Sequence, residues 1–330
     1  MCIRDRPGSD LAMYFPVDWG IGFVFVANLT ASIGTFLLLL PTVFSSLNSR
    51  SKQNVPTDFS STVFQYSWPL VIASTAGIVN ELIDRLMLKE LLEGGLDERM
   101  SQVGIYSACY KIAILINLFT QAFNYAAEPF FFRNESKDNA RALYAKVTLL
   151  YTLVACIAMG GICMNLNIFQ YFIGSSYREG LVIVPVLLVA NLFLGLYYNV
   201  AIWYKLSGQT KYGASIGVFG AGITILANIA LIPLFIQWGR YGYEGSAWAT
   251  LICYASMLIA AAYFGRKQYP IPYAFSKIFL MLLVTVTYSA IFLYMQSGFD
   301  YSVIRGVFAF LGLIMILFLM NRDTLRTISK

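Results

Sequence analysis

Long apolar segments follow one another along the whole chain and are separated by short polar stretches. Within each segment the apolar positions are continuous instead of alternating, which favours membrane-crossing helices over alternating strands. The predicted segments lie at about 19–42, 62–86, 103–130, 143–165, 181–203, 213–236, 246–264, 275–296 and 302–320. The pattern therefore predicts an all-α, polytopic membrane protein with about nine transmembrane helices.

The composition supports a membrane protein and limits the kinds of catalytic or metal site that the chain can form. Of the 330 residues, 58% are hydrophobic and 12% are charged, whereas soluble domains carry about 25% charged residues. The chain has no histidine, so the side chain most often used as a general base, metal ligand or pH switch is missing. The five cysteines form no CxxC pair. We therefore predict no catalytic residue, no metal site and no cofactor.

Basic residues concentrate in every second connection between the predicted helices and in the C-terminal tail. They are Arg50, Lys52, Arg133, Lys137, Arg141, Lys146, Lys205, Lys211, Arg266, Lys267, Lys277, Arg322, Arg326 and Lys330. The positive-inside rule places this set in the cytoplasm, so the first helix begins outside and the C-terminus is cytoplasmic. Topology thereby explains the net charge of +6, and no nucleic-acid partner is predicted.

A polar stripe follows the second predicted span. Glu81, Asp84 and Arg85 fall within about 100° on a helical wheel, and Glu81 precedes Arg85 by four residues, the favourable order for an ion pair. An unpaired charge near the bilayer centre costs at least about 2.5–3.5 kcal/mol, so the stripe is expected to face a wet cavity or the bundle interior. Since Asp84 and Arg85 lie near the outer end of the span, snorkelling to the interface is an open alternative.

The third predicted span carries a similar stripe, in which Lys111, Gln121, Asn124 and Glu128 fall within about 140°. Lys111 lies roughly 12 Å from the outer end of the span. We therefore predict a contact between Glu81 and Lys111 across the two helices, either as a structural ion pair or as part of a cavity. Glu128 precedes a proline near the cytoplasmic end, where a structural kink or an interfacial position is the alternative role.

Two weaker signals concern helix packing. The segment "GVFGAG" (217–222) follows no strand, so close helix packing is predicted there and not a phosphate-binding loop. Asn191, Asn199 and Asn228 lie inside predicted spans, where interhelical hydrogen bonds are their expected role.

Four stretches taken together resemble bacterial membrane proteins of lipopolysaccharide or polysaccharide biosynthesis. The stretches are "YSWPLVIASTAGIVNELIDRLML" (66–88), "VGIYSACYKIAILINLFTQAFNYAAEPFFF" (103–132), "YYNVAIWYKLSGQTKYGA" (197–214) and "GYEGSAWATLICY" (242–254). Such proteins form the polysaccharide transporter family, in the superfamily that includes multidrug and toxin extruders and lipid II flippases. The resemblance covers about residues 18–322 and rests on the order and spacing of the stretches.

The resemblance implies two six-helix lobes around a central cavity, followed by two further helices. The chain then starts inside the N-terminal lobe, and five preceding helices are expected to be missing. The leader begins with "MCIRDR", which resembles translated adapter sequence and is expected to be non-native. The expected parts are a leader and outer segment (1–16), the last N-lobe helix (17–44), a cytoplasmic linker (45–60), a complete C-terminal lobe (61–264), an additional helix pair (265–320) and a cytoplasmic tail (321–330).

The function implied by this resemblance is transport. A flippase of the bacterial cytoplasmic membrane would move a polyprenyl-pyrophosphate-linked oligosaccharide from the inner to the outer leaflet by alternating access, for polysaccharide or lipopolysaccharide biosynthesis. The expected partners are this lipid-linked oligosaccharide, membrane lipids and the missing N-terminal lobe.

Seven residues are candidates for the site, chosen by helical wheel and depth and not by a family motif. The residues expected to bind substrate, with the two cations on the pyrophosphate, are Arg85, Lys111, Gln121 and Asn124. The residues expected to hold a coupling proton or sodium ion are Glu81, Asp84 and Glu128.

Three alternatives remain open. A multidrug and toxin extruder of the same fold would export organic cations through a cavity dominated by acids and aromatics, whereas Arg85 and Lys111 favour an anionic ligand. A membrane polysaccharide polymerase or ligase usually carries a large outer loop with catalytic Arg or His, and the sequence offers neither. A non-transporting scaffold of a glycan assembly complex is the third.

Overall fold

The described part of the chain is almost entirely helical. The computed structural model describes residues 22–48, 58–296 and 301–328, and no strand occurs among them. The chain divides into two compact units, Met1–Phe59 and Ser60–Lys330.

The first unit contains one described helix, α1 (Gly22–Asn48). Its segment Phe25–Ser45 is long and apolar enough to cross a membrane. The helix continues to Asn48 and so includes the first residues of the predicted linker. The predicted leader (1–16) and linker residues 49–57 lie outside the described residues.

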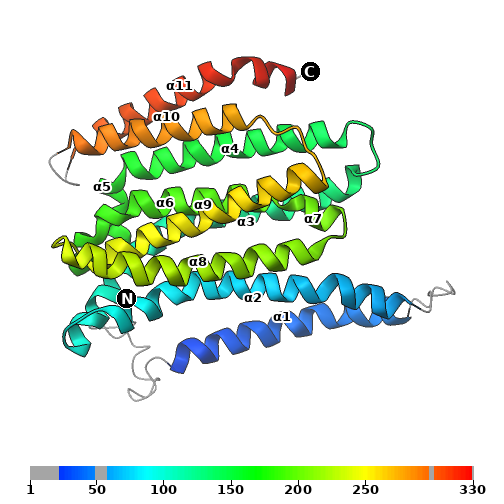
Figure 1. The fold of residues 1–330 in the computed structure, drawn as a ribbon, viewed down its shortest axis with the longest axis horizontal. Helices are drawn as coiled ribbons and strands as arrows, with labels where there is room; N and C mark the ends of the chain where they lie inside the picture. Colours follow the sequence, from blue (N-terminus) through cyan, green and yellow to red (C-terminus); the bar gives the residue numbers. More distant parts are fainter. Residues whose placement is uncertain (1–21, 49–57, 297–300, 329–330) are drawn as a thin grey trace. The chain divides into compact units, whose positions relative to one another are not determined.

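The second unit is a bundle of long helices that lie side by side, and most consecutive long helices run in opposite directions (Figure 1). Its elements are α2 (Phe59–Leu91), α3 (Leu96–Asn134), α4 (Ala140–Met164), α5 (Leu166–Phe169), η4 (Gln170–Phe172), η5 (Ser175–Ile183), α6 (Val184–Val200), α7 (Ile202–Leu206), α8 (Thr210–Gln237), α9 (Gly242–Gln268), α10 (Phe275–Tyr294) and α11 (Val303–Ile328). The connections α3–α4, α7–α8 and α9–α10 lie at the same end of this unit. We call it the basic end, because these are the connections rich in Lys and Arg.

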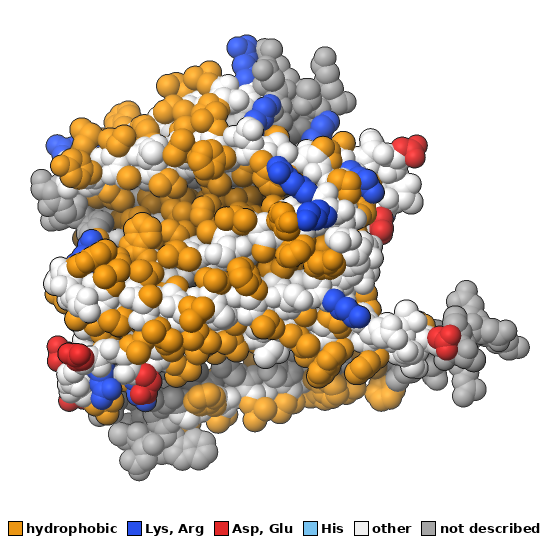
Figure 2. All heavy atoms as spheres, viewed as in Figure 1, with side chains coloured by type: hydrophobic (Ala, Val, Ile, Leu, Met, Phe, Trp, Pro, Cys, Tyr) orange, Lys and Arg blue, Asp and Glu red, His pale blue; other side chains and the backbone are white. Residues whose placement is uncertain are grey.

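Eight helical segments within the described residues are long and apolar enough to cross a membrane. Helix α2 is not among them, because polar and charged residues interrupt its apolar sequence. The chain is therefore a multi-pass membrane protein, while the predicted count of nine spans is not confirmed. Figure 2 shows hydrophobic side chains over the middle of the helices and charged side chains toward their ends, as a bilayer requires.

Several helices are longer than the predicted spans. Helix α3 has 39 residues, roughly 58 Å at 1.5 Å per residue, which exceeds the hydrocarbon thickness of about 30 Å. Helix α11 continues to Ile328 and so includes most of the predicted tail. The connection between the predicted spans 143–165 and 181–203 contains the short helical turns α5, η4 and most of η5.

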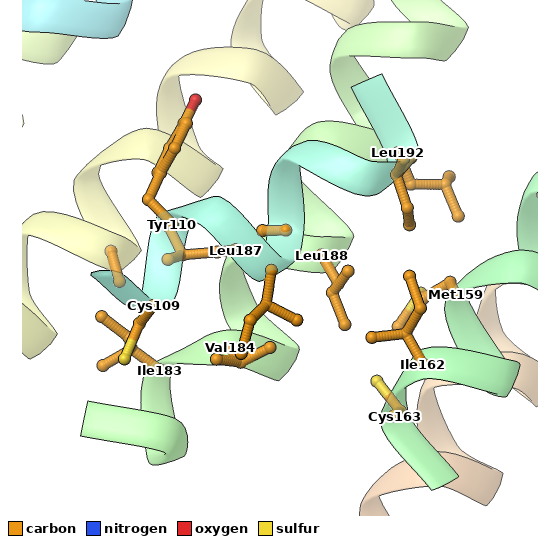
Figure 3. Packing of buried hydrophobic residues seen from close by; sticks show 14 of the residues in the cluster. Cys109, Tyr110, Met159, Ile162, Cys163, Ile183, Val184, Leu187, Leu188 and Leu192 are labelled. Carbon is orange, nitrogen blue, oxygen red and sulfur yellow. The ribbon is translucent and has the colours of Figure 1, made fainter. Parts of the chain in front are cut away.

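Helix α6 forms the centre of the second unit and packs against α3, α4 and α9. Figure 3 shows Leu187 and Leu188 of α6 between Cys109 of α3 and Met159 of α4. Both leucines are fully buried. Lipid is as apolar as leucine, so close packing holds such helices together more than the hydrophobic effect does. Helices α10 and α11 pack on α4 and complete the unit.

Small residues bring α8 and its neighbours close together. A Cβ atom added to Gly245 of α9 would lie 2.5 Å from the carbonyl oxygen of Leu231 in α8. A Cβ atom at Gly220 would lie 2.5 Å from the sulfur of Met257 in α9, whereas one at Gly222 would meet open space. The predicted role of the segment 217–222 in close helix packing is therefore confirmed, though not at every glycine.

Candidate functional site

The inward face of α2 carries two polar residues. The buried residues of this helix are Pro69, Ala76, Asn80, Asp84 and Leu88, which are spaced by four or seven residues and so form one stripe. Asn80 and Asp84 are 2% and 1% exposed. Since buried polar groups require partners, this stripe marks the first part of the candidate site.

The Asp84 carboxylate accepts hydrogen bonds from three other helices. The amide nitrogen of Asn228 in α8 lies 2.8 Å from Oδ1. The hydroxyl groups of Tyr106 in α3 and Thr250 in α9 lie 2.9 Å and 2.7 Å from Oδ2. Both carboxylate oxygens are therefore satisfied without a cation, and we call this set of four residues the Asp84 network.

Further polar side chains extend the network. Ser246 donates to Oδ1 of Asn228 at 2.8 Å, and Thr224 donates to Oδ1 of Asn80 at 3.2 Å. No ion pair of Asp84 occurs within the described part of the chain. Carboxylate, amide and hydroxyl oxygens are the ligands that hard cations prefer. A dry carboxylate beside two hydroxyl oxygens is suited to hold one proton or one small cation.

Arg85 lies against α3 and makes no ion pair with Asp84 within the described residues. Its Nε donates to the hydroxyl of Ser107 at 3.2 Å, and its Nη1 donates to the main-chain carbonyl of Glu81 at 2.6 Å. The guanidinium carbon lies 5.0 Å from the ring centroid of Tyr110. The predicted side-chain pair between Glu81 and Arg85 is therefore wrong, because Arg85 binds the backbone of Glu81 and an aromatic face instead.

The predicted contact between Glu81 and Lys111 is also wrong. Lys111 is exposed, and no ion pair involves it among the described residues. The reason lies in the register of α3, whose neighbouring residues Tyr110 and Ile112 are buried. Residue 111 shares its helix face with Leu118, two turns later, and Leu118 is 56% exposed.

A cavity of about 550 Å³ lies between α2, α3, α6, α7 and α9. Its polar lining residues are Ser74, Asn80, Glu81, Asn117, Thr120, Gln121, Tyr125, Asn124, Glu128, Tyr197, Tyr198, Tyr204, Lys205 and Tyr254. Apolar residues of the same five helices complete the wall. The lining of α3 begins at Asn117, past the middle of that helix, so the cavity extends from the centre of the bundle toward the basic end.

One ion pair lies on the cavity wall near the basic end. Nζ of Lys205 in α7 lies 2.8 Å from Oε1 of Glu128 in α3. The side chains are 28% and 41% exposed, so the described residues cover neither completely. The Glu81 carboxylate makes no ion pair within the described part of the chain, which leaves the described lining with one uncompensated negative charge.

The structure places the predicted site residues in three locations. Glu81, Gln121, Asn124 and Glu128 line the cavity, Asp84 lies in the dry network, and Arg85 and Lys111 are outside the cavity lining. Asn80 lies at the boundary, since it lines the cavity and also bonds to Thr224. The predicted stripe thus separates into a wet part and a dry part.

Several members of the site were not identified from the sequence as site residues. Lys205 was counted only among the basic connections, and no pattern separated it from cations that set topology. Asn228 was predicted to bond between helices, which its bond to Asp84 confirms. The same prediction is wrong for Asn191 and Asn199, whose amide nitrogens donate to carbonyls four residues earlier in α6.

The site therefore combines a polar, tyrosine-rich cavity with a buried carboxylate beside it. Amides and tyrosine hydroxyls both donate and accept hydrogen bonds, so the cavity can bind a hydroxyl-rich or charged ligand inside a membrane. Among the described residues, no group of three or more His, Cys, Asp or Glu could hold a metal ion. No family model, no curated protein and no solved structure matches this chain.

Proposed function

We propose that this chain is part of a membrane transporter that moves a polyprenyl-pyrophosphate-linked oligosaccharide from the inner to the outer leaflet of a bacterial cytoplasmic membrane. The observation that carries the proposal is the cavity of about 550 Å³ with its amide and tyrosine lining. A bundle that served only as a scaffold would have no need to keep so many polar groups unsealed at membrane depth, because they are costly there.

The chemistry of the lining fits sugars. Asn117, Gln121 and Asn124 offer paired donors and acceptors, and tyrosine rings such as Tyr125 and Tyr198 offer flat apolar faces beside them. Sugar rings have hydroxyl groups around an apolar face, and this combination binds both. Gln121 and Asn124 thus keep the substrate role expected from the sequence, while Arg85 and Lys111 are not carried into the proposal.

Asp84 is proposed to hold the coupling proton or sodium ion. The carboxylate is buried, and its donors among the described residues are neutral, so a bound cation would remove the cost of a lone buried charge. Asn80 lines the cavity and accepts from Thr224, whose main-chain carbonyl accepts from Asn228 of the Asp84 network. This chain of contacts gives a route by which occupation of one place can affect the other. Glu81 faces the cavity and is available to ligands there.

The direction of transport follows from charge. The basic end is proposed to face the cytoplasm by the positive-inside rule, and the cavity extends toward that end. Export of an anionic headgroup from a negative interior is downhill by about 2.3 kcal/mol per charge per 100 mV. Alternating access would need movement against the N-terminal lobe that the resemblance implies.

Export of organic cations is a second candidate, and one observation favours it. The lining combines the Glu81 carboxylate, which has no ion pair among the described residues, with five tyrosines, while Arg85 and Lys111 lie outside it. This is the pattern of acids and aromatics expected of a multidrug and toxin extruder, because a cation binds both groups.

Ligand binding separates the two candidates. The full chain in neutral phosphatidylcholine nanodiscs would be titrated with a farnesyl-pyrophosphate-linked disaccharide and, separately, with tetraphenylphosphonium. Saturable binding of the disaccharide that Gln121→Ala and Asn124→Ala weaken supports the glycan transporter. Binding of tetraphenylphosphonium alone, lost in Glu81→Gln, supports the cation exporter and contradicts the first proposal.

A further inference from the structure

Lys205 lies near the basic end of the bundle, where a membrane surface is expected. It is the residue before Leu206, where α7 ends, and the connection to α8 that follows belongs to the basic end. Among the described residues that line the cavity, it is the one Lys or Arg. A pyrophosphate attached to a prenyl chain lies at headgroup depth, since the chain remains in the hydrocarbon. Lys205 therefore lies at the depth where such a phosphate enters.

The contact between Lys205 and Glu128 is of a kind that another anion can replace. Within the described residues its ammonium makes one hydrogen bond, to Glu128, although an ammonium group has three donors. Both side chains are partly exposed, and ion pairs of this kind contribute little to stability. A phosphate can displace the Glu128 carboxylate because it offers more charge and more acceptor oxygens to the same ammonium.

Polar residues of α3 continue inward from this pair. Asn124 lies one helical turn from Glu128, and Gln121 and Asn117 lie about two and three turns from it, at about 5 Å per turn. All of them line the cavity. A ligand with a phosphate at Lys205 would thus place the attached sugars along a row of amides, with its lipid tail left outside.

From this arrangement we infer that Lys205 is the phosphate-recognition residue of the cavity, and that Glu128 occupies its ammonium until a prenyl-linked phosphate displaces it. The inference rests on the lipid-linked substrate proposed above. It replaces Arg85 and Lys111 as the expected phosphate ligands and gives Glu128 a placeholder role instead of an ion-coupling one.

The test measures binding of farnesyl pyrophosphate to the full chain in neutral phosphatidylcholine nanodiscs, with uncharged farnesol as the matched probe. Lys205→Ala is expected to weaken farnesyl pyrophosphate binding about 10- to 100-fold, the loss that follows from one charged hydrogen bond. Farnesol binding should not change. Glu128→Gln is expected to bind farnesyl pyrophosphate as tightly as the native chain or more tightly, since the competing carboxylate is gone.

Two controls keep the result interpretable. Lys211→Ala removes an exposed cation at the same end of the bundle, outside the cavity lining, and is expected to leave binding unchanged. The exchanged pair Glu128→Lys with Lys205→Glu keeps an ion pair at this place and moves the ammonium onto α3. If Lys205→Ala fails to fold, this double variant should fold and retain farnesyl pyrophosphate binding.

The outcomes separate the inference from the proposed function. If the native chain binds no farnesyl pyrophosphate, the lipid-linked substrate is overturned and the inference with it. If the native chain binds it and Lys205→Ala binds equally well, the inference alone is overturned. A loss of binding in Glu128→Gln as large as that in Lys205→Ala would show that the ion pair only stabilises the structure and that Lys205 does not bind phosphate, which overturns the inference.

Discussion

Asp84 and Glu81 are two carboxylates on one helix, three residues apart, and their surroundings are opposite. Asp84 is 1% exposed and accepts hydrogen bonds from α3, α8 and α9. Glu81 is half-buried and lines the cavity, with no ion pair in the described part of the chain. Three residues turn an α-helix through about 300°, which leaves the two side chains about 60° apart.

The comparison teaches that a polar stripe on a membrane helix need not have one role. A turn of 60° around the helix axis leads from a packed interior, where every hydrogen-bond donor needs an acceptor, to the wall of the cavity. The dry side depends on the close approach of α8 and α9. The wet side depends on the absence of that packing, so mutations on the two sides should behave differently.

The largest expected effect is on the dry carboxylate. Asp84→Ala leaves the donors of Asn228, Tyr106 and Thr250 without their acceptor and should lower the free energy of unfolding by about 2–4 kcal/mol. Glu81→Ala on the neighbouring face should change it by less than about 0.5 kcal/mol. Thermal unfolding of both variants in nanodiscs measures this difference, and equal losses would remove the distinction between the two sides.

The next effect concerns the packing that keeps the network dry. Gly245→Ala forces a Cβ against the backbone of Leu231 and should cost about 1–3 kcal/mol. The control is Gly222→Ala in α8, where open space surrounds the Cβ position. That substitution should be neutral or stabilise by up to about 1 kcal/mol, because alanine is the better helix former. Similar costs at both positions would contradict the close approach of α8 and α9.

A smaller effect separates two buried asparagines. Asn228→Leu removes the donor to Asp84 and should destabilise by about 1–3 kcal/mol. Asn191→Leu replaces an amide whose oxygen has no hydrogen-bond partner among the described residues and whose nitrogen donates within α6, so it should be neutral or stabilising. Denaturant or thermal unfolding measures the stability of both variants. A larger loss in Asn191→Leu than in Asn228→Leu would mean that Asn228 contributes nothing to the network.

The smallest effect is expected at Lys111. Its side chain is exposed and lies outside the cavity lining, so Lys111→Ala should change stability by less than about 0.5 kcal/mol. Its affinity for farnesyl pyrophosphate should equal that of the native chain. A loss comparable to that of Lys205→Ala would return Lys111 to the substrate path.

The helices were predictable from the sequence because apolar runs of membrane length have few other uses. The approximate positions of all the predicted spans after residue 58 correspond to helices of the second unit. The number of membrane spans did not follow from the apolar runs alone, since α2 is long enough to span but carries polar residues that lower its hydropathy. Helix ends were missed because α3 and α11 continue beyond the apolar runs.

The site was predictable only in part. A helical wheel shows which residues share a face, and it brought Glu81, Gln121, Asn124 and Glu128 together correctly as neighbours of one cavity. It does not show what the face meets, so Lys111 was assigned inward although its face is the exposed one that carries Leu118. The partners of Asp84 come from residues 22 to 166 positions away, and helix packing alone brings them together.

Water access to one face of α3 tests the central claim most directly. Asn124→Cys and Leu118→Cys would be exposed to a charged, membrane-impermeant thiol reagent in nanodiscs, with the native chain as blank because its described cysteines are buried. The account predicts labelling of residue 124, as for Ser136→Cys in the exposed α3–α4 connection. It predicts no labelling of residue 118, which is exposed outside the cavity lining and is expected to face lipid, since a thiol in lipid neither ionises nor meets the reagent. Labelling of residue 118 but not of residue 124 would contradict the cavity and the transport proposal that depends on it.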